Sequence, residues 1–386
     1  MTQATKTPFL LIFLLWGAGL GAAGQFAKIS VIFPSLQEIY PNSGASLGFL
    51  VSLISFLGIG FGLFAGLILA NVSFRKILLS ALLLGAVISA LQSLIPSLPL
   101  MLFSRLIEGI SHLIIVVAAP TLIAQLSAPQ HRNSCMIIWS TFFGVAFAIT
   151  AWLGIPLAEK YGPSSLFTAH SIYMAMIAVL LAFTLPKTPA SHTKLALGFN
   201  NILALHLKIY SSPQQAAPAL GWLFYTLTFV SLLTVLPDFV SEEDRTLISG
   251  ILPLSGLIMS ITLGMLLLRY FAAINVVMIG FACALATVLL IAILPSSPWL
   301  LVALVATLGL VQGASFASIP QLNPNATDQA HANGAMAQMG NLGNTLGTPI
   351  ALVVLAGFGF NGLLVFLGFC YACGLLLHIL QARRRA

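Results

Sequence analysis

Long apolar stretches separated by short polar turns cover nearly the whole chain. Each stretch is close to the length of about 20 residues that an α-helix needs to cross a bilayer. The pattern predicts an all-α membrane protein with twelve transmembrane helices. The predicted spans cover residues 8–33, 46–70, 77–95, 98–123, 134–158, 165–185, 217–236, 247–268, 272–294, 298–317, 334–358 and 362–380.

The composition excludes most other classes of protein. Hydrophobic residues make up 59% of the 386 residues and charged residues only 6%, whereas soluble domains carry about 25% charged residues. A soluble enzyme or a nucleic-acid-binding domain is therefore excluded. No HExxH, GxSxG or Walker sequence is present, so we expect no enzymatic activity, no cofactor and no metal site. The cysteines lie in apolar runs, which argues against a disulfide framework.

The distribution of basic residues predicts the orientation of the chain in the membrane. If the N-terminus is cytoplasmic, the outer loops contain Lys160 and Arg245, and all other loop cations lie inside. This bias is the one that cytoplasmic loops show. We expect a monomer in a bacterial cytoplasmic (inner) membrane, with both termini in the cytoplasm. The predicted inside cations are Lys6, Arg75, Lys76, Arg132, Lys187, Lys194, Lys208, Arg269, Arg383, Arg384 and Arg385.

An internal repeat divides the predicted spans into two groups of six. Three short motifs recur at offsets of 203, 202 and 204 residues, which favours a duplicated architecture. We predict an N-terminal bundle at 1–186, a cytoplasmic linker at 187–215 that contains an amphipathic helix along the inner membrane face, and a C-terminal bundle at 216–386. The recurring pairs are Val31–Pro34 with Thr234–Pro237, Leu47-Gly48 with Ser249-Gly250, and Ile107–Gly109 with Val311–Gly313.

At this point the chain resembles the major facilitator superfamily over essentially its full length. A basic pair, Arg75-Lys76, lies between spans 2 and 3, and Arg105 precedes Gly109 in the spacing of the family's span-4 signature. Asn71 stands where the family usually has an acidic residue, and the Gly-Pro pair of the exporters is absent from span 5. The resemblance implies alternating access, a site near the interface of the two halves, a cavity lined by spans 1, 4, 7 and 10, and conformational gating by Asn71, Arg75 and Lys76.

Ionisable side chains inside the spans are costly to desolvate, so each is a candidate functional group. Lys28 in span 1 and Arg105 in span 4 lie at similar depth, roughly 10 Å below the outer boundary. Glu108 and His112 follow Arg105 on one helix face, and Gln25 lies one turn inward of Lys28. The cations are candidates for holding an anion, and Glu108 or His112 for exchanging protons. The alternative is an Arg105–Glu108 pair that only braces the helix.

These groups predict the class of solute. Two cations and one carboxylate leave a charge of +1 within the spans, which attracts an organic anion or a zwitterion. We therefore expect a proton-coupled secondary transporter for such a small-molecule solute. A proton-driven efflux pump for amphipathic drugs is the alternative within transporters. An intramembrane enzyme and a non-transporting sensor are the rivals from other classes.

The second half of the chain offers amides and aromatic rings in place of buried charges. Gln338, Asn341 and Asn344 recur every third residue in span 11, and Gln312 lies in span 10. They form either a helix-packing stripe or a wall that contacts substrate. Trp222 and Tyr225 in span 7 are further substrate candidates, although Trp222 also suits an interfacial anchor. His170 in span 6 has no ionisable neighbour in sequence, and we interpret it as structural.

Overall fold

The computed structural model describes residues 6–41, 43–61, 73–186, 199–294, 297–324 and 326–385. Within these ranges the chain is helical and contains no β-strand. Its contacts divide it into two compact units. The first holds the described residues of Met1–Tyr40, Leu53–Leu57 and Phe64–Lys194, and the second those of Pro41–Ser52, Gly58–Leu63 and Leu195–Ala386. The linear division at 186 and 215 stays a prediction.

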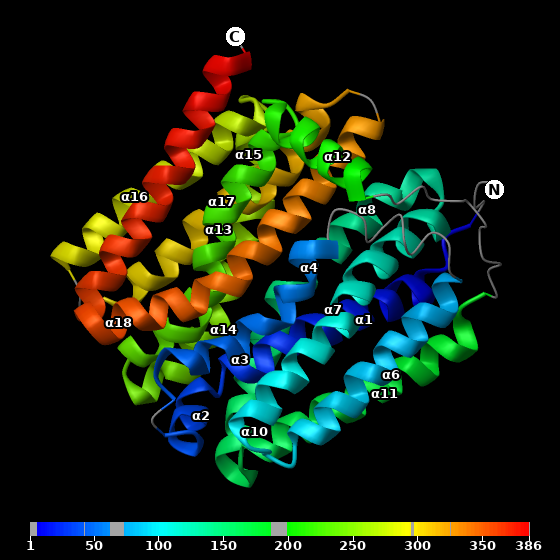
Figure 1. Cartoon of the computed structure of the whole chain (residues 1–386), viewed down its shortest axis with the longest axis vertical. Helices are drawn as coiled ribbons and strands as arrows, with labels where there is room; N and C mark the ends of the chain where they lie inside the picture. Colours follow the sequence, from blue (N-terminus) through cyan, green and yellow to red (C-terminus); the bar gives the residue numbers. More distant parts are fainter. Residues whose placement is uncertain are drawn as a thin grey trace. The chain divides into compact units, whose positions relative to one another are not determined.

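The first unit is a bundle built around α1, α6, α7 and α11 (Figure 1). Helix α6 packs against α7 and α11, while α1 packs against α7, α9 and α11. A turn of π-helix over Thr150–Gly154 joins α9 to α10. The helices are α1 Phe9–Ser30, α2 Phe33–Ile39, α6 Phe74–Gln92, α7 Leu98–Leu126, α8 Pro129–Ser140, α9 Phe142–Ile149, α10 Ile155–Tyr161 and α11 Pro163–Thr184.

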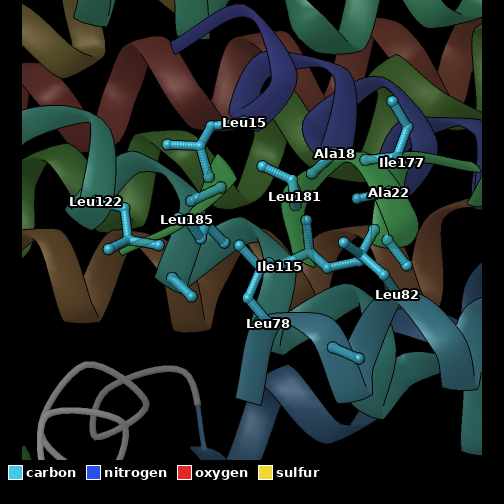
Figure 2. Packing of buried hydrophobic residues seen from close by; sticks show 14 of the residues in the cluster. Leu15, Ala18, Ala22, Leu78, Leu82, Ile115, Leu122, Ile177, Leu181 and Leu185 are labelled. Carbon is cyan, nitrogen blue, oxygen red and sulfur yellow. The ribbon is translucent and has the colours of Figure 1, made fainter. Parts of the chain in front are cut away.

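Aliphatic side chains from these four helices form the core of the first unit. Leu15 of α1, Leu82 of α6, Ile115 of α7 and Leu181 of α11 are all buried in this cluster (Figure 2). Helix α1 approaches its neighbours closely because it is rich in glycine and alanine. A Cβ on its Gly21 would lie 2.4 Å from the Met174 sulfur of α11, so a larger residue there would require the Met174 side chain to move.

The second predicted span is divided into short helical pieces. They are η1 Gly44–Gly48, α3 Phe49–Ser52, η2 Leu53–Ser55 and α4 Phe56–Phe61. Gly109 of α7 packs on the Ile54 carbonyl oxygen, which would lie 2.5 Å from an added Cβ. The predicted continuation of this span from residue 62 to 70 lies outside the described residues.

The second unit contains the remaining helices. They are α12 Phe199–Ser211, α13 Ala216–Val235, α14 Glu242–Met259, α15 Met265–Leu267, α16 Ala273–Ile293, α17 Pro298–Leu322 and α18 Ala326–Arg385. Gly359 interrupts α18 with φ 62° and ψ −160°, a backbone conformation that glycine adopts without a steric penalty. It lies between the predicted spans 334–358 and 362–380.

The all-α class is confirmed, but the number of helices long enough to cross a membrane differs from the predicted twelve. Among the described residues, ten helices are long and apolar enough to cross a membrane. The last of them, His331–Arg385, contains the break at Gly359, and a shorter apolar stretch covers Ser46–Phe61. The count of twelve is therefore not matched helix for helix. The break at Gly359 separates two helical segments of α18, in agreement with the separate predicted spans 334–358 and 362–380.

Glycines bring α18 close to α13 within the second unit. A Cβ on Gly343 would lie 2.8 Å from the Leu223 carbonyl oxygen, and one on Gly347 would lie 2.2 Å from the Leu227 carbonyl oxygen. Backbone carbonyls cannot move aside as a flexible side chain can. These glycines therefore form a helix-packing seam, as small residues do between membrane helices.

Helix α12 packs on the second unit through its apolar face. Ile209 is buried beside Ala219 of α13 and Met336 of α18. Two arginines at the end of α18 hold the segment that follows α12: Arg384 donates to the Ser211 carbonyl (3.1 Å) and Arg385 to the Pro213 carbonyl (2.9 Å). The amphipathic helix predicted in the linker is present, and its apolar face contacts protein. Residues 187–198 of the linker lie outside the described residues.

Candidate site: a buried ion cluster in the first unit

Three charged side chains meet in the interior of the first unit. The Nζ atom of Lys28 lies 2.6 Å from Oε1 of Glu108, and Nη1 of Arg105 donates to Oε2 of the same carboxylate. Lys28 comes from α1, whereas Arg105 and Glu108 lie one turn apart on α7. All three are at most 1% exposed. The two cations therefore share one counter-ion, and Arg105 and Glu108 form the pair that the bracing alternative requires.

Helix α6 completes the cluster with two uncharged side chains. Gln92 donates to Oε2 of Glu108 (2.9 Å) and to the hydroxyl of Ser104 on α7 (3.0 Å). Ser89, one turn earlier, accepts a hydrogen bond from Lys28 Nζ at 2.5 Å. Both oxygens of Glu108 are thus occupied, and Lys28 has an uncharged acceptor in addition to its ion pair.

His170 of α11, which has no ionisable neighbour in sequence, joins the same network in the structure. Its Nδ1 lies 2.7 Å from the hydroxyl of Ser89, which in turn accepts from Lys28. Its Nε2 lies 2.9 Å from the Gly21 carbonyl oxygen of α1. Sequence distance concealed this contact, because His170 and Ser89 come from different helices that only the packing of the bundle brings together.

Gln25 and His112 lie next to the cluster and bond elsewhere. Gln25 donates to the Ser111 hydroxyl (3.0 Å), and Nδ1 of His112 lies 3.1 Å from the Ala22 carbonyl oxygen. The imidazole of His112 also packs edge-on against Phe26, with ring centroids 5.1 Å apart. Within the described residues, no hydrogen bond joins His112 to Glu108. Its contacts are those of a hydrogen-bonded packing residue.

The cluster carries one more cation than anion. Lys28 and Arg105 ionised against one ionised Glu108 leave a formal +1 charge in the bundle interior. Each buried ion loses several kcal/mol of hydration, which a close partner and further hydrogen bonds must offset. The face of Phe167, 5.6 Å from Lys28 Nζ, adds a favourable cation–π contact. The excess positive charge is the feature that an anion would satisfy.

Two of the predicted gating residues, Arg75 and Lys76, lie near the start of α6 and away from this cluster. Arg75, near the start of α6, donates to the Ala182 carbonyl of α11. Lys76 is exposed. Asn71 lies outside the described residues, so its side chain is not placed. Arg75 thus joins α6 to α11 near the start of α6, whereas Ser89 lies near the end of α6.

The aromatic candidates of the second unit form a stack on α13. The rings of Trp222 and Tyr225 are 4.4 Å apart with an interplanar angle of 20°, and Tyr225 stacks on Phe229 at 5.0 Å. Phe316 of α17 meets Trp222 edge-on at 5.2 Å and is 52% exposed. Tyr225 itself is only 2% exposed. These rings form a continuous stack that is buried at Tyr225 and Phe229 and exposed at Phe316.

The predicted amides do not share one environment. Gln338 is engaged on both sides of its amide: it accepts from the Tyr210 hydroxyl of α12 (2.8 Å) and donates to the Ile59 carbonyl (2.8 Å). Asn341 donates to the carbonyl of Ala337 on its own helix. Asn344 and Gln312 are half-buried. Gln338 therefore holds the linker helix, while the other amides are less constrained.

Sequence reasoning missed three members of the ion cluster: Ser89, Gln92 and His170. One signal was present, since Ser89 and Gln92 lie three residues apart and share a face of an otherwise apolar span. Single hydroxyls and amides are common in membrane helices, so this spacing alone does not distinguish them. No group of three or more His, Cys, Asp or Glu residues suited to a metal ion occurs in the described part of the chain.

Comparisons with known proteins agree with this architecture. The family model of the Major Facilitator Superfamily matches residues 11–348. Two solved structures of a bacterial homologue of the human lysosomal transporter Spinster are similar to the chain at 14% sequence identity. The inward-facing unoccupied form gives a TM-score of 0.76 with 97% of each chain covered. The inward-facing occupied form gives 0.72 with 97% of this chain and 96% of that chain covered.

No curated protein sequence matches the chain significantly. The family model nevertheless covers most of its length, and the solved structures share its fold. The chain is thus a multi-pass membrane protein with the fold of a secondary transporter, not an enzyme. It belongs to the Major Facilitator Superfamily.

Proposed function

We propose that this transporter moves a small organic anion or a carboxylate-bearing zwitterion together with protons by alternating access. The observation that carries the proposal is the buried cluster in which Lys28 and Arg105 share the single carboxylate of Glu108. A membrane interior tolerates such charges poorly, so uncompensated charge there is usually functional. The +1 excess selects against lipophilic cations and in favour of anions.

The charge balance of the cluster links anion binding to proton binding. When Glu108 is ionised it satisfies both cations, so an incoming carboxylate competes with it for Lys28 and Arg105. Protonation of Glu108 removes its negative charge, raises the cluster from +1 to +2, and frees both donors for the substrate carboxylate. Binding of the anion then restores +1. Proton and anion therefore bind with positive coupling, which is the requirement for symport. His112 is a second candidate for the exchanged proton.

Access to this cluster requires movement, because its charged groups are buried. Alternating access opens them to water on one side of the membrane at a time. We assign conformational gating to Arg75, Lys76 and Asn71, on the family's motif. Gln25 is a further substrate contact on α1, one turn from Lys28.

The second unit contributes the remaining substrate contacts in this proposal. They are the aromatic rings Trp222 and Tyr225 and the amides Gln312, Gln338, Asn341 and Asn344. The same stack of rings, continued by Phe316, favours one alternative function, a proton-driven efflux pump for amphipathic drugs. Flat aromatic surfaces bind such molecules through apolar area with little demand for a specific charge.

Uptake by purified protein in liposomes tests the proposal. Three radiolabelled probes, lactate, succinate and glutamate, represent a monoanion, a dianion and a zwitterion, and an imposed pH gradient supplies the driving force. We expect accumulation of at least one probe by the wild type and its loss in Lys28→Met and Arg105→Met. Lys160→Met is the matched control, because Lys160 is exposed.

Two results would contradict this function. Normal uptake by folded Lys28→Met would remove Lys28 from substrate recognition. Gradient-independent uptake would remove proton coupling. If the wild type moves none of the probes but raises the drug tolerance of cells that express it, the efflux alternative replaces the anion transporter.

We also propose that the protein acts as a monomer in a bacterial inner membrane with both termini in the cytoplasm. Single cysteines at the exposed positions Lys160 and Arg269 test the orientation. A membrane-impermeant maleimide added to intact cells should label Lys160→Cys and not Arg269→Cys. The opposite labelling would invert the topology.

A further inference from the structure

We infer that His170, acting through Ser89, is a positioning residue for Lys28. The inference rests on the proposed function, since it concerns the cation assigned to substrate recognition. The inference goes beyond the proposed function by giving a role to a histidine of α11 and a serine of α6. Its observation is an unbroken chain of short contacts: Lys28 Nζ to Ser89 Oγ at 2.5 Å, Ser89 Oγ to His170 Nδ1 at 2.7 Å, and His170 Nε2 to the Gly21 carbonyl oxygen at 2.9 Å.

The partners fix the direction of every hydrogen bond in this chain. The Gly21 carbonyl can only accept, so Nε2 of His170 carries a hydrogen. The Lys28 ammonium can only donate, so the Ser89 oxygen accepts from it. The remaining Ser89 hydrogen then points to Nδ1 of His170, which accepts as a neutral imidazole does. With a neutral His170, the hydrogen-bonding atoms of the Ser89 hydroxyl and of the His170 ring therefore all have partners.

This arrangement opposes protonation of His170. In an imidazolium both ring nitrogens are donors, so Nδ1 could no longer accept the Ser89 hydrogen, which would need a new acceptor in a buried environment. A second positive charge would also lie close to Lys28. The contacts therefore favour a neutral His170, which holds the Ser89 oxygen toward Lys28.

The surroundings of His170 contain the charged groups of the ion cluster. Lys28 faces it from α1, and Glu108 and Arg105 act on it from α7. Helix α6 faces it with the Ser89 hydroxyl, and the charged residues of α10 are exposed. His170 thus lies beside the same three ions that the proposed function uses.

Tyr173, one turn further along α11, provides a matched control. The Tyr173 hydroxyl donates to the Gly17 carbonyl of α1 at 2.9 Å, just as His170 donates to the Gly21 carbonyl. Tyr173→Phe removes a bond between the same two helices without touching Lys28 or Ser89. Any effect of merely loosening α11 from α1 should appear in this variant as well.

The experiment measures the KM for exchange of the accumulated probe (lactate, succinate or glutamate) in liposomes held at equal pH on both sides. At about pH 7.5, Ser89→Ala should raise KM about tenfold, the typical effect of losing one hydrogen bond to a charged group. Tyr173→Phe should leave KM unchanged. His170→Leu should raise KM as Ser89→Ala does, because the Ser89 hydrogen then has no acceptor, whereas His170→Asn keeps an amide oxygen that can accept it.

Two variants of His170 separate positioning from simple packing. Both His170→Leu and His170→Asn remove the imidazole that bonds to the Gly21 carbonyl of α1, but only His170→Leu removes the acceptor for the Ser89 hydrogen. The KM of His170→Leu should therefore exceed that of His170→Asn by about tenfold. Equal KM values for these two variants, or a normal KM for Ser89→Ala, would overturn the inference.

A second measurement requires no transport. In protein labelled with ¹⁵N-histidine, the His170 resonances are identified by their absence from His170→Asn, and Ser89→Ala should shift the Nδ1 signal while Tyr173→Phe should not. An unchanged Nδ1 signal in Ser89→Ala would refute the anchor itself. If the anchor is present but the wild type accumulates no probe, the proposed function has failed, and not the hydrogen-bonded chain.

Discussion

Replacing Glu108 by glutamine should destabilise the protein more than any other single change in the ion cluster. The substitution keeps the size of the side chain and removes the one negative charge that Lys28 and Arg105 share. Two cations then remain buried without a counter-ion. Removal of one partner from a buried ion pair typically costs about 3–5 kcal/mol, and here the lost partner serves two ions.

Lys28→Met provides the comparison from which the magnitude is judged. It leaves the pair of Arg105 with Glu108 intact and makes the cluster neutral. The lost hydrogen bonds are offset by relief from burying an ammonium group, since apolar replacements of buried ions are often neutral. We expect Lys28→Met to lower the free energy of unfolding by much less than Glu108→Gln does.

The assay is unfolding of purified protein in mild detergent by added denaturing detergent, followed by tryptophan fluorescence. The double variant Lys28→Met/Glu108→Gln should recover part of the loss, because only Arg105 then lacks a counter-ion. Equal stability of Glu108→Gln and wild type would refute the reasoning. So would a larger loss in Lys28→Met than in Glu108→Gln.

Two further predictions concern the second unit. Gly347→Ala should lower the melting temperature and the yield of folded protein, since its Cβ would meet a backbone carbonyl and overpacking typically costs about 1–3 kcal/mol. Gly357→Ala in the same helix has no heavy atom within 4 Å of the added Cβ and should melt like the wild type; equal melting of both variants would contradict the packing seam. Tyr210→Phe removes the bond to Gln338 and should increase proteolysis of the linker helix, with a loss of about 1 kcal/mol. Tyr270→Phe, at a side chain 75% exposed, should change neither, and unaltered proteolysis of Tyr210→Phe would leave α12 held by its apolar face alone.

The sequence predicted the helices well because the bilayer constrains them strongly. A membrane interior leaves backbone groups no partner outside a helix, so apolar length alone locates most elements. Positions within those helices are constrained far less. The π-helical turn before α10 depends on local backbone conformation, which hydropathy does not report. The interruption of α18 at Gly359, by contrast, falls between two predicted spans.

The candidate site was predictable where charge was involved and not where neutral side chains were. Lys28 and Arg105 are conspicuous because so few ions occur in the spans, and helix rise gave them similar depth. Their shared contact with Glu108 needed the packing of α1 on α7. Ser89 and His170 entered the network through the packing of α6 and α11, which no pattern within either span reports.

The arginines at the end of α18 give the C-terminus a mechanical role. Arg384 and Arg385 donate hydrogen bonds to the carbonyls of Ser211 and Pro213. The last turn of α18 therefore anchors the stretch that leads from the end of α12 into α13. Shortening the chain by its terminal arginines would release that stretch. A purification tag should therefore be appended beyond Arg385 through a flexible spacer, and a truncated protein should not be used as a neutral stand-in for the whole chain.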